Sequence, residues 1–192
     1  SDKDGNIAFI HNSMTPVRIP GYNWHNYLPG DKSSLIWDSY ISFEKLPMVI
    51  NPSSGYLISA NQSPFFVTSD KDNPDRKNYS NEDGFPTRMT NRAVRGLELL
   101  SELDKIDEQT FSDIKHDKKY SKNSRAYRYL EKAMLANLGD LNTQKHEIYA
   151  NAQTILKKWD LSTDKNNRGA ALGTCVIGAE WLAEQQGENP PD

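Results

Sequence analysis

The spacing of apolar residues changes near residue 86 of this chain, and the change predicts two kinds of structure. Before that point, short apolar runs are separated by Pro, Gly and Asn, which is typical of strands joined by turns. Three of these runs predict strands: residues 7–10, 48–50 and 56–58. A turn at residues 51–55 separates the last two runs. The turn-rich residues 16–37 and the polar residues 68–86 predict loops.

Beyond residue 86 the apolar positions recur every three or four residues, as they do on one face of a helix. Five such stripes predict helices around residues 93–100, 111–114, 126–138, 148–159 and 169–186. Asp107 is placed to cap the second of these helices, which would bury Phe111 and Ile114. Gly139 would end the third helix.

Because strands come first and helices follow, without regular alternation, the order predicts an α+β fold. The division gives a strand-and-loop segment at residues 1–86 and a mainly helical segment at residues 87–192, of which residues 187–192 form a tail. Four Trp, nine Tyr and six Phe provide material for a core, but the mean hydropathy of −0.78 keeps that core modest.

Charge and cysteine content exclude several classes of protein. The net charge of −3 argues against a general nucleic-acid binder, because phosphate contacts require an excess of Lys and Arg. No apolar run approaches the roughly 20 residues that a membrane-spanning helix needs. The single cysteine, Cys175, excludes a disulfide within the chain and a thiolate metal cluster. Its small and apolar neighbours in residues 170–179 predict a buried thiol.

Familiar catalytic and metal-binding motifs are missing from the sequence. The chain has four scattered histidines: His11, His25, His116 and His146. They lack the spacing of a metal-binding pair, and no Gly-x-Ser-x-Gly elbow or phosphate-binding Gly loop occurs. Asp70, Asp72 and Asp75 are spaced like carboxylates around a hard cation, but the glycine and the distal glutamate of a calcium loop are absent. A solvated polar loop is the simpler interpretation of these three residues.

The end of the third apolar run is the most informative position. The run 56–58 stops just before Asn61, and Pro64 follows. An Asn at the end of a rigid strand can direct its side-chain amide outward, which is the geometry of an oxyanion-hole donor. A turn-capping Asn is the alternative interpretation.

Several short motifs together carry a family resemblance. They are residues 5–9, 28–30, 37, 43–47, 51–64, 88–92, 97–100, 156–160 and 168–170. Their order and spacing over residues 4–182 resemble the β chain of penicillin-acylase-type enzymes. The nearest likeness is to the branch that contains acyl-homoserine lactone and aculeacin acylases.

The resemblance implies an activity and a fold. These enzymes are N-terminal nucleophile hydrolases with an αββα core, and this chain would be an internal segment of that core. A serine at the start of the released β chain attacks an amide bond, using its own α-amine as the base. Substrates would be N-acylated small molecules such as acyl-homoserine lactones, β-lactams or acyl peptides. The partners would be the remaining α- and β-chain segments of the same precursor, in the periplasm or outside the cell.

Only a few residues can be carried over from the resemblance. Asn61 matches the asparagine whose side chain donates to the oxyanion, and Arg88 matches an arginine that supports it and the developing charge. Asp72 lies near the position where some members place a carboxylate on a structural calcium ion, and no other cofactor is required. Ser1 aligns with an internal strand and turn, so we expect the nucleophile to lie in another segment of a processed or excised precursor.

Two other functions stay open at this stage. A non-catalytic module on the same fold could bind a small molecule, peptide or carbohydrate through the aromatic residues in 22–37. A calcium-stabilised extracellular structural domain could form around Asp70, Asp72 and Asp75. A position of Arg88 near Asn61 would favour the enzyme over the binding module.

Overall fold

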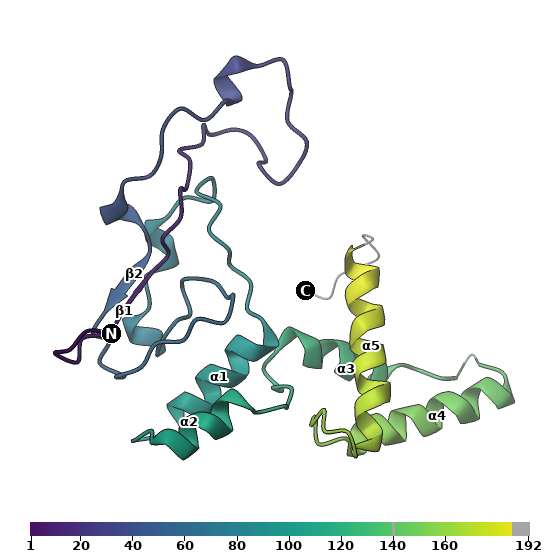
Figure 1. Ribbon diagram of the computed structural model, residues 1–192. Helices are drawn as coiled ribbons and strands as arrows, with labels where there is room; N and C mark the ends of the chain where they lie inside the picture. The colour runs from purple at the N-terminus through teal and green to yellow at the C-terminus, as the bar shows by residue number, and fades with distance from the viewer. Residues whose placement is uncertain (140, 186–192) are drawn as a thin grey trace. The chain divides into compact units, whose positions relative to one another are not determined.

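The computed structural model describes residues 1–139 and 141–185, and the chain divides into two compact units, Ser1–Met89 and Thr90–Asp192 (Figure 1). The first unit contains a two-stranded sheet and long loops, and the described part of the second contains five α-helices. This mixture agrees with the predicted α+β class.

The sheet of the first unit joins two segments that lie far apart in the sequence. Strand β1 (Ala8–Ile10) pairs antiparallel with β2 (Met48–Ile50), and Phe9 lies opposite Val49. Both strands were predicted from their apolar runs. Val49 is buried, so the pairing brings an apolar side chain into the interior of the unit.

The prediction of a third strand at residues 56–58 is wrong. Ile58 donates one main-chain hydrogen bond to Val67, 2.8 Å, but no ladder forms there. The carbonyl of Tyr56 instead accepts a hydrogen bond from the Thr68 hydroxyl, 2.9 Å. Side chains therefore satisfy polar groups that a neighbouring strand would otherwise pair.

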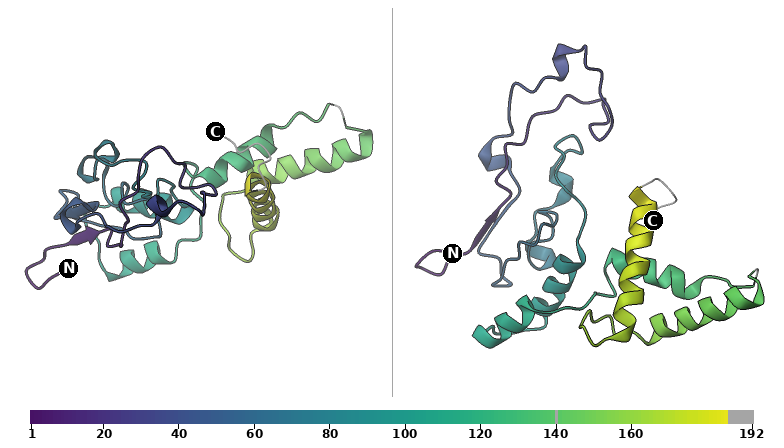
Figure 2. Two further views of the ribbon diagram at one scale, coloured as in Figure 1. Left: turned by 90° about the horizontal axis from the view of Figure 1, so that it is seen from above. Right: turned by 45° about the vertical axis from the view of Figure 1, so that its right-hand side comes forward.

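Residues 16–40 form a long excursion, drawn in purple to blue in Figure 2. It is closed at its base by an antiparallel bridge between Pro16 and Tyr40 and contains the short 3-10 helix η1 (Ser33–Leu35). The Arg18 guanidinium lies 5.6 Å from the ring centroid of Trp24 and 5.8 Å from that of Trp37. These cation–π contacts pack the two tryptophans of this loop around one arginine.

An aromatic cluster forms the core of the first unit. Leu46, Phe65 and Phe85 are buried and pack together, with Ile41 and Tyr79 beside them. The rings of Phe65 and Phe85 meet edge to face at 6.3 Å. Three further 3-10 turns lie around this core: η2 (Phe43–Lys45), η3 (Asp70–Asp72) and η4 (Arg76–Asn78).

The helices of the second unit are α1 (Asn91–Ser101), α2 (Glu108–Lys115), α3 (Arg125–Leu135), α4 (Thr143–Lys158) and α5 (Arg168–Gln185). Polar side chains cap the first four helices at Thr90, Asp107, Ser124 and Asn142. Each cap accepts a hydrogen bond from a main-chain N–H group that has no partner inside the helix. The predicted cap at Asp107 is confirmed.

The core of the second unit lies where α3, α4 and α5 meet (Figures 1 and 2). Its buried members are Leu130, Leu156, Trp159 and Leu161. The indole N–H of Trp159 donates to the carbonyl of Ser162, 2.8 Å, so the buried ring has no unpaired donor.

Four expectations about the helices are wrong. Helix α3 ends at Leu135, before Gly139. Phe111 is 59% exposed, because α2 packs mainly against the single helix α1 and leaves its other faces uncovered. Cys175 is exposed, because α5 is apolar on several faces and only some of them are covered. Ile148 and Ile155 are also exposed, although they belong to the apolar stripe of α4.

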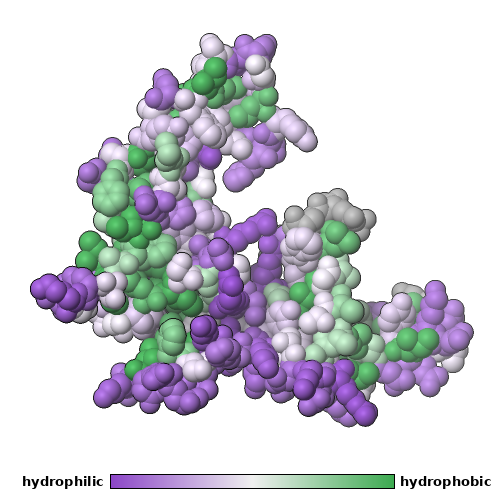
Figure 3. All heavy atoms as spheres, viewed as in Figure 1, coloured by the Kyte–Doolittle hydropathy of each residue, from purple (hydrophilic) through white to green (hydrophobic). Residues whose placement is uncertain are grey.

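Apolar side chains reach the surface in both units (Figure 3). The most exposed include Met14, Tyr27, Ile36, Leu135, Ile148 and Trp181. None of the helices in the described part of the chain is both long and apolar enough to cross a membrane. The tail predicted at residues 187–192 lies outside the described residues.

Candidate functional site

Asn61 lies in a loop and has buried residues on both sides of it in the sequence. Its φ angle is +57°, in the left-handed region, which Asn adopts more readily than other residues with a Cβ. Asn61 is exposed, whereas its neighbours Ala60, Gln62 and Ser63 are buried. The expected strand end is replaced by this turn, but the consequence is similar, because buried neighbours flank an exposed asparagine.

The side chain of Gln62, one of these buried neighbours, bonds to the main chain of the loop. Its carbonyl oxygen accepts a hydrogen bond from the main-chain N–H of Ala60, 2.5 Å. Its amide nitrogen donates to the carbonyls of Ile58, 2.8 Å, and Phe66, 3.3 Å. One buried amide thus connects the two arms of the loop. No apolar period or motif in the sequence predicts this connection.

Arg88 reaches the same loop through its main chain. The main-chain N–H of Ser63 donates to the Arg88 carbonyl, 3.2 Å. Ser63 is completely buried and lies two residues after Asn61. The fold therefore brings the segment of Arg88 to the segment of Asn61, although 27 positions separate the two residues in the sequence. The Arg88 side chain is exposed.

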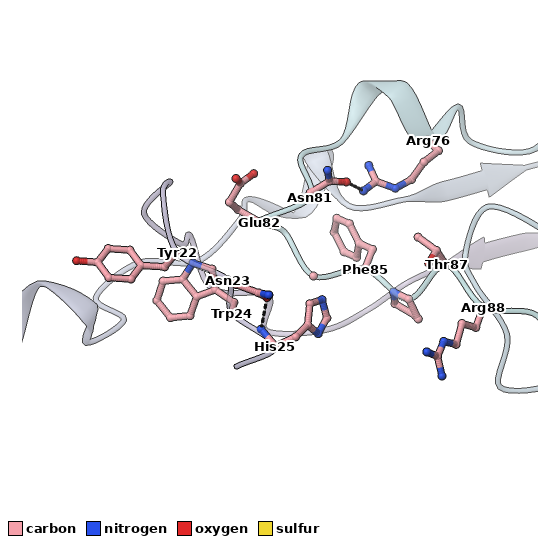
Figure 4. Close-up of a pocket in the computed structure, with 12 residues that line it drawn as sticks. Tyr22, Asn23, Trp24, His25, Arg76, Asn81, Glu82, Phe85, Thr87 and Arg88 are labelled. Carbon is pink, nitrogen blue, oxygen red and sulfur yellow. Dashed lines mark hydrogen bonds between the residues drawn. The ribbon is translucent and has the colours of Figure 1, made fainter. Parts of the chain in front are cut away.

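Arg88 also lines a pocket of about 550 Å³ in the first unit (Figure 4). The other charged, histidine and aromatic residues of its lining are Tyr22, Trp24, His25, Arg76, Glu82 and Phe85. Aromatic walls suit a ligand that has an apolar surface, and the lining adds the charges of two arginines and one glutamate. No motif in the sequence singles out Arg76, which lies in the stretch 68–86 that is predicted to be a polar loop.

Asp72 ties two turns of the first unit together. Its Oδ2 atom accepts hydrogen bonds from the Ser53 hydroxyl, 2.7 Å, the Ser54 N–H, 3.3 Å, and the Ser69 hydroxyl, 3.3 Å. The Ser53 hydrogen bond in particular lowers the pKa of the Asp72 carboxyl. A carboxylate held in its charged form is suited to a cation as well as to these donors.

The other two aspartates of this stretch do not join Asp72 in one cluster. Asp75 caps η4 by accepting from the Lys77 N–H, 2.9 Å. Within the described residues, no group of three or more His, Cys, Asp or Glu side chains is arranged to hold a metal ion. Calcium at Asp72 stays a prediction, and further oxygen ligands would have to complete the site.

Comparison with known proteins identifies the family of the chain. The family model described as penicillin amidase matches residues 1–185. Penicillin G acylase from Escherichia coli is 29% identical over 109 residues, which are 57% of this chain and 11% of that enzyme. The aligned region therefore spans only a small part of this relative. The likeness to acyl-homoserine lactone and aculeacin acylases in particular stays a prediction. Because the family model matches nearly the whole sequence, the chain belongs to the penicillin amidase family.

Proposed function

We propose that the protein carrying this chain hydrolyses the amide bond of N-acylated small molecules. Acyl-homoserine lactones, β-lactams with an acylated amine, and acyl peptides are the candidate substrates. Family membership over residues 1–185 supports the reaction type, and the partial match to a penicillin G acylase agrees with it. On the family resemblance we also propose that the protein acts in the periplasm or outside the cell.

In this proposal the chain stabilises the transition state and another segment of the precursor supplies the nucleophile. A serine hydroxyl attacks the amide carbon, and its proton passes to the serine's own α-amine. The carbonyl oxygen then becomes an oxyanion, to which the Asn61 side-chain N–H donates a hydrogen bond. Such a donor typically contributes about 2.7–4 kcal/mol of transition-state stabilisation. Collapse of the intermediate releases the amine, and water hydrolyses the acyl-enzyme.

Arg88 has a supporting role in this scheme. A guanidinium near the oxyanion would favour the developing negative charge and would not need a proton transfer to do so. The observation that carries the proposal is the hydrogen bond from Ser63 N–H to the Arg88 carbonyl, 3.2 Å, beside an exposed Asn61 with buried neighbours.

The test is a pair of glycine substitutions at two left-handed asparagines. Asn61→Gly keeps the backbone conformation and removes the amide, and we expect kcat on a chromogenic N-acyl anilide to fall about 100- to 1000-fold. Asn51 has a φ of +48°, and its side chain bonds to Ile7 and Asn6. Asn51→Gly is the control and should cost stability without a comparable loss of kcat. An unchanged kcat in Asn61→Gly would rule out the oxyanion role.

Binding without catalysis is the second candidate, and the pocket beside Arg88 favours it. Tyr22, Trp24 and Phe85 provide aromatic surface there, which suits stacking against a sugar or a ring of a peptide side chain. If the intact protein lacks hydrolytic activity on every N-acyl substrate tested but binds a ligand, and Trp24→Ala abolishes that binding, this second function replaces the first.

A further inference from the structure

We infer that Gln62 is the positioning residue for Asn61, an inference that rests on the proposed oxyanion role. The side-chain amide of Gln62 makes three hydrogen bonds to the main chain on either side of Asn61. Its carbonyl oxygen holds the N–H of Ala60, the residue before Asn61, and Gln62 itself is the residue after it. The main chain on both sides of Asn61 is thereby fixed by a single amide.

The same amide also reaches across the loop. Its nitrogen donates to the carbonyls of Ile58 and Phe66, which belong to the arms entering and leaving the turn. Gln62 is 8% exposed, so its hydrogen bonds are made largely away from water, where unpaired main-chain groups are costly. No strand ladder forms at residues 56–58, so these bonds act with the single main-chain hydrogen bond from Ile58 N–H to Val67 to hold the two arms together beside Asn61.

Placement of this kind affects the rate more than it affects binding. An oxyanion donor acts only when it lies at hydrogen-bond distance from the charge that develops in the transition state. A displacement of about 1 Å at a reacting centre can cost up to about 100-fold in rate. A left-handed turn flanked by loosened arms would allow such a displacement, whereas substrate held by other segments would still bind.

Asn73 provides a matched control in the same unit. Its carbonyl oxygen accepts from the N–H groups of Val67, 2.7 Å, and Thr68, 3.2 Å. Its nitrogen donates to the carbonyls of Thr68, 3.1 Å, and Ser69, 3.1 Å. Asn73 therefore clamps a loop with a side-chain amide, as Gln62 does, but none of these partners adjoins Asn61.

The experiment compares Gln62→Met with Asn73→Leu in the intact protein, each alone and combined with Asn61→Gly. Both substitutions replace an amide by an apolar side chain of similar size and should lower the thermal midpoint. We expect Gln62→Met to lower kcat about 10- to 100-fold with KM nearly unchanged. We expect Asn73→Leu to leave kcat within a few-fold of the starting protein.

The combined variants separate positioning from general damage. If Gln62 acts through Asn61, Gln62→Met has little further effect on kcat once the Asn61 amide is gone. An equal effect of Gln62→Met in both backgrounds, or a loss no larger than that of Asn73→Leu, would overturn the inference. Full activity of Asn61→Gly would instead overturn the proposed function. If Gln62→Met does not fold, Gln62→Glu, which keeps an acceptor for Ala60 N–H, undergoes the same comparison.

Discussion

Gly173 lies directly beneath the indole ring of Trp159. A Cβ atom at Gly173 would lie 2.1 Å from Cζ3 of that ring, and one at Gly169 would lie 2.7 Å from Cδ1. The two glycines are one helical turn apart on α5, so the Trp159 ring packs directly against the helix backbone at these positions. Trp159 is 7% exposed and belongs to the buried core of the second unit. Close approach of ring and helix therefore depends on the absence of side chains.

Substitution of Gly173 tests this packing. Gly173→Ala should lower the free energy of unfolding by about 1–3 kcal/mol, because the added methyl overfills a packed core. Gly178 is on the same helix and has open space around its Cβ position. Gly178→Ala should be neutral or stabilising by up to about 1 kcal/mol, because Ala is the better helix former. Denaturant unfolding of both variants gives the comparison, and equal changes would contradict the packing account.

A buried carboxylate on α5 gives a second stability test. Glu184 accepts hydrogen bonds from Arg125 and Tyr129 on α3, and its side chain is 5% exposed. Arg125→Met should destabilise the protein by about 3–5 kcal/mol, because it removes a cation that pairs with a buried carboxylate. Lys132 pairs with Glu180 at 2.9 Å, but its side chain is 55% exposed. Lys132→Met should cost less than about 1 kcal/mol, and an equally large loss would show that burial does not set the difference.

Much of the helical unit could be predicted from the sequence, because local signals determine it. Asp107 caps α2 as expected, since the cap bonds lie within one turn and need no distant partner. The exposure of Phe111 and Cys175 could not be predicted, because it depends on which helix faces are covered. The strand predicted at residues 56–58 fails for a similar reason. The carbonyl of Tyr56 bonds to the side chain of Thr68 and not to a neighbouring strand, and a local apolar run cannot show this.

The candidate site was only partly predictable, for a related reason. The end of an apolar run singles out Asn61, and the family resemblance adds Arg88. Their approach through Ser63 is a main-chain contact between distant segments. Gln62 gives no periodic signal, because a side chain that bonds to the main chain of its own loop needs neither helical nor strand spacing. Such residues become visible only when the loop is seen in three dimensions.

His11 should make the stability depend on pH. Its ring packs edge-on against Phe85 at 5.4 Å, and burial lowers its pKa below the ordinary value of 6.5. The folded state then favours the neutral ring, so this contribution to stability is complete above pH 6.5 and is lost as the pH falls through the lowered pKa. His11→Phe removes the titration and keeps a ring at the contact. The thermal midpoint should fall less between pH 7.5 and pH 5 in His11→Phe than in the starting protein, and identical slopes would exclude His11 as a source of acid sensitivity.

Calcium at Asp72 can be tested by chelation. If a calcium ion binds the folded protein there, adding a chelator should lower the thermal midpoint, because the ligand stabilises only the state that binds it. Asp72→Asn should abolish the difference between calcium and chelator. The substitution should also weaken the hydrogen bonds from Ser53 and Ser69, and so lower the midpoint in both conditions. If the thermal midpoint of the starting protein is the same with calcium and with chelator, calcium does not bind at Asp72.

The most direct test of the oxyanion role of Asn61 is the binding of a phosphonate, in which tetrahedral phosphorus replaces the carbonyl carbon of the substrate. Its charged oxygen occupies the position of the oxyanion, whereas the carboxylic acid product lacks that tetrahedral geometry. We predict that Asn61→Gly weakens inhibition by the phosphonate about 100- to 1000-fold and inhibition by the product less than about threefold. Equal weakening of both inhibitors, or no weakening of either, would contradict the assignment of Asn61 as the oxyanion donor.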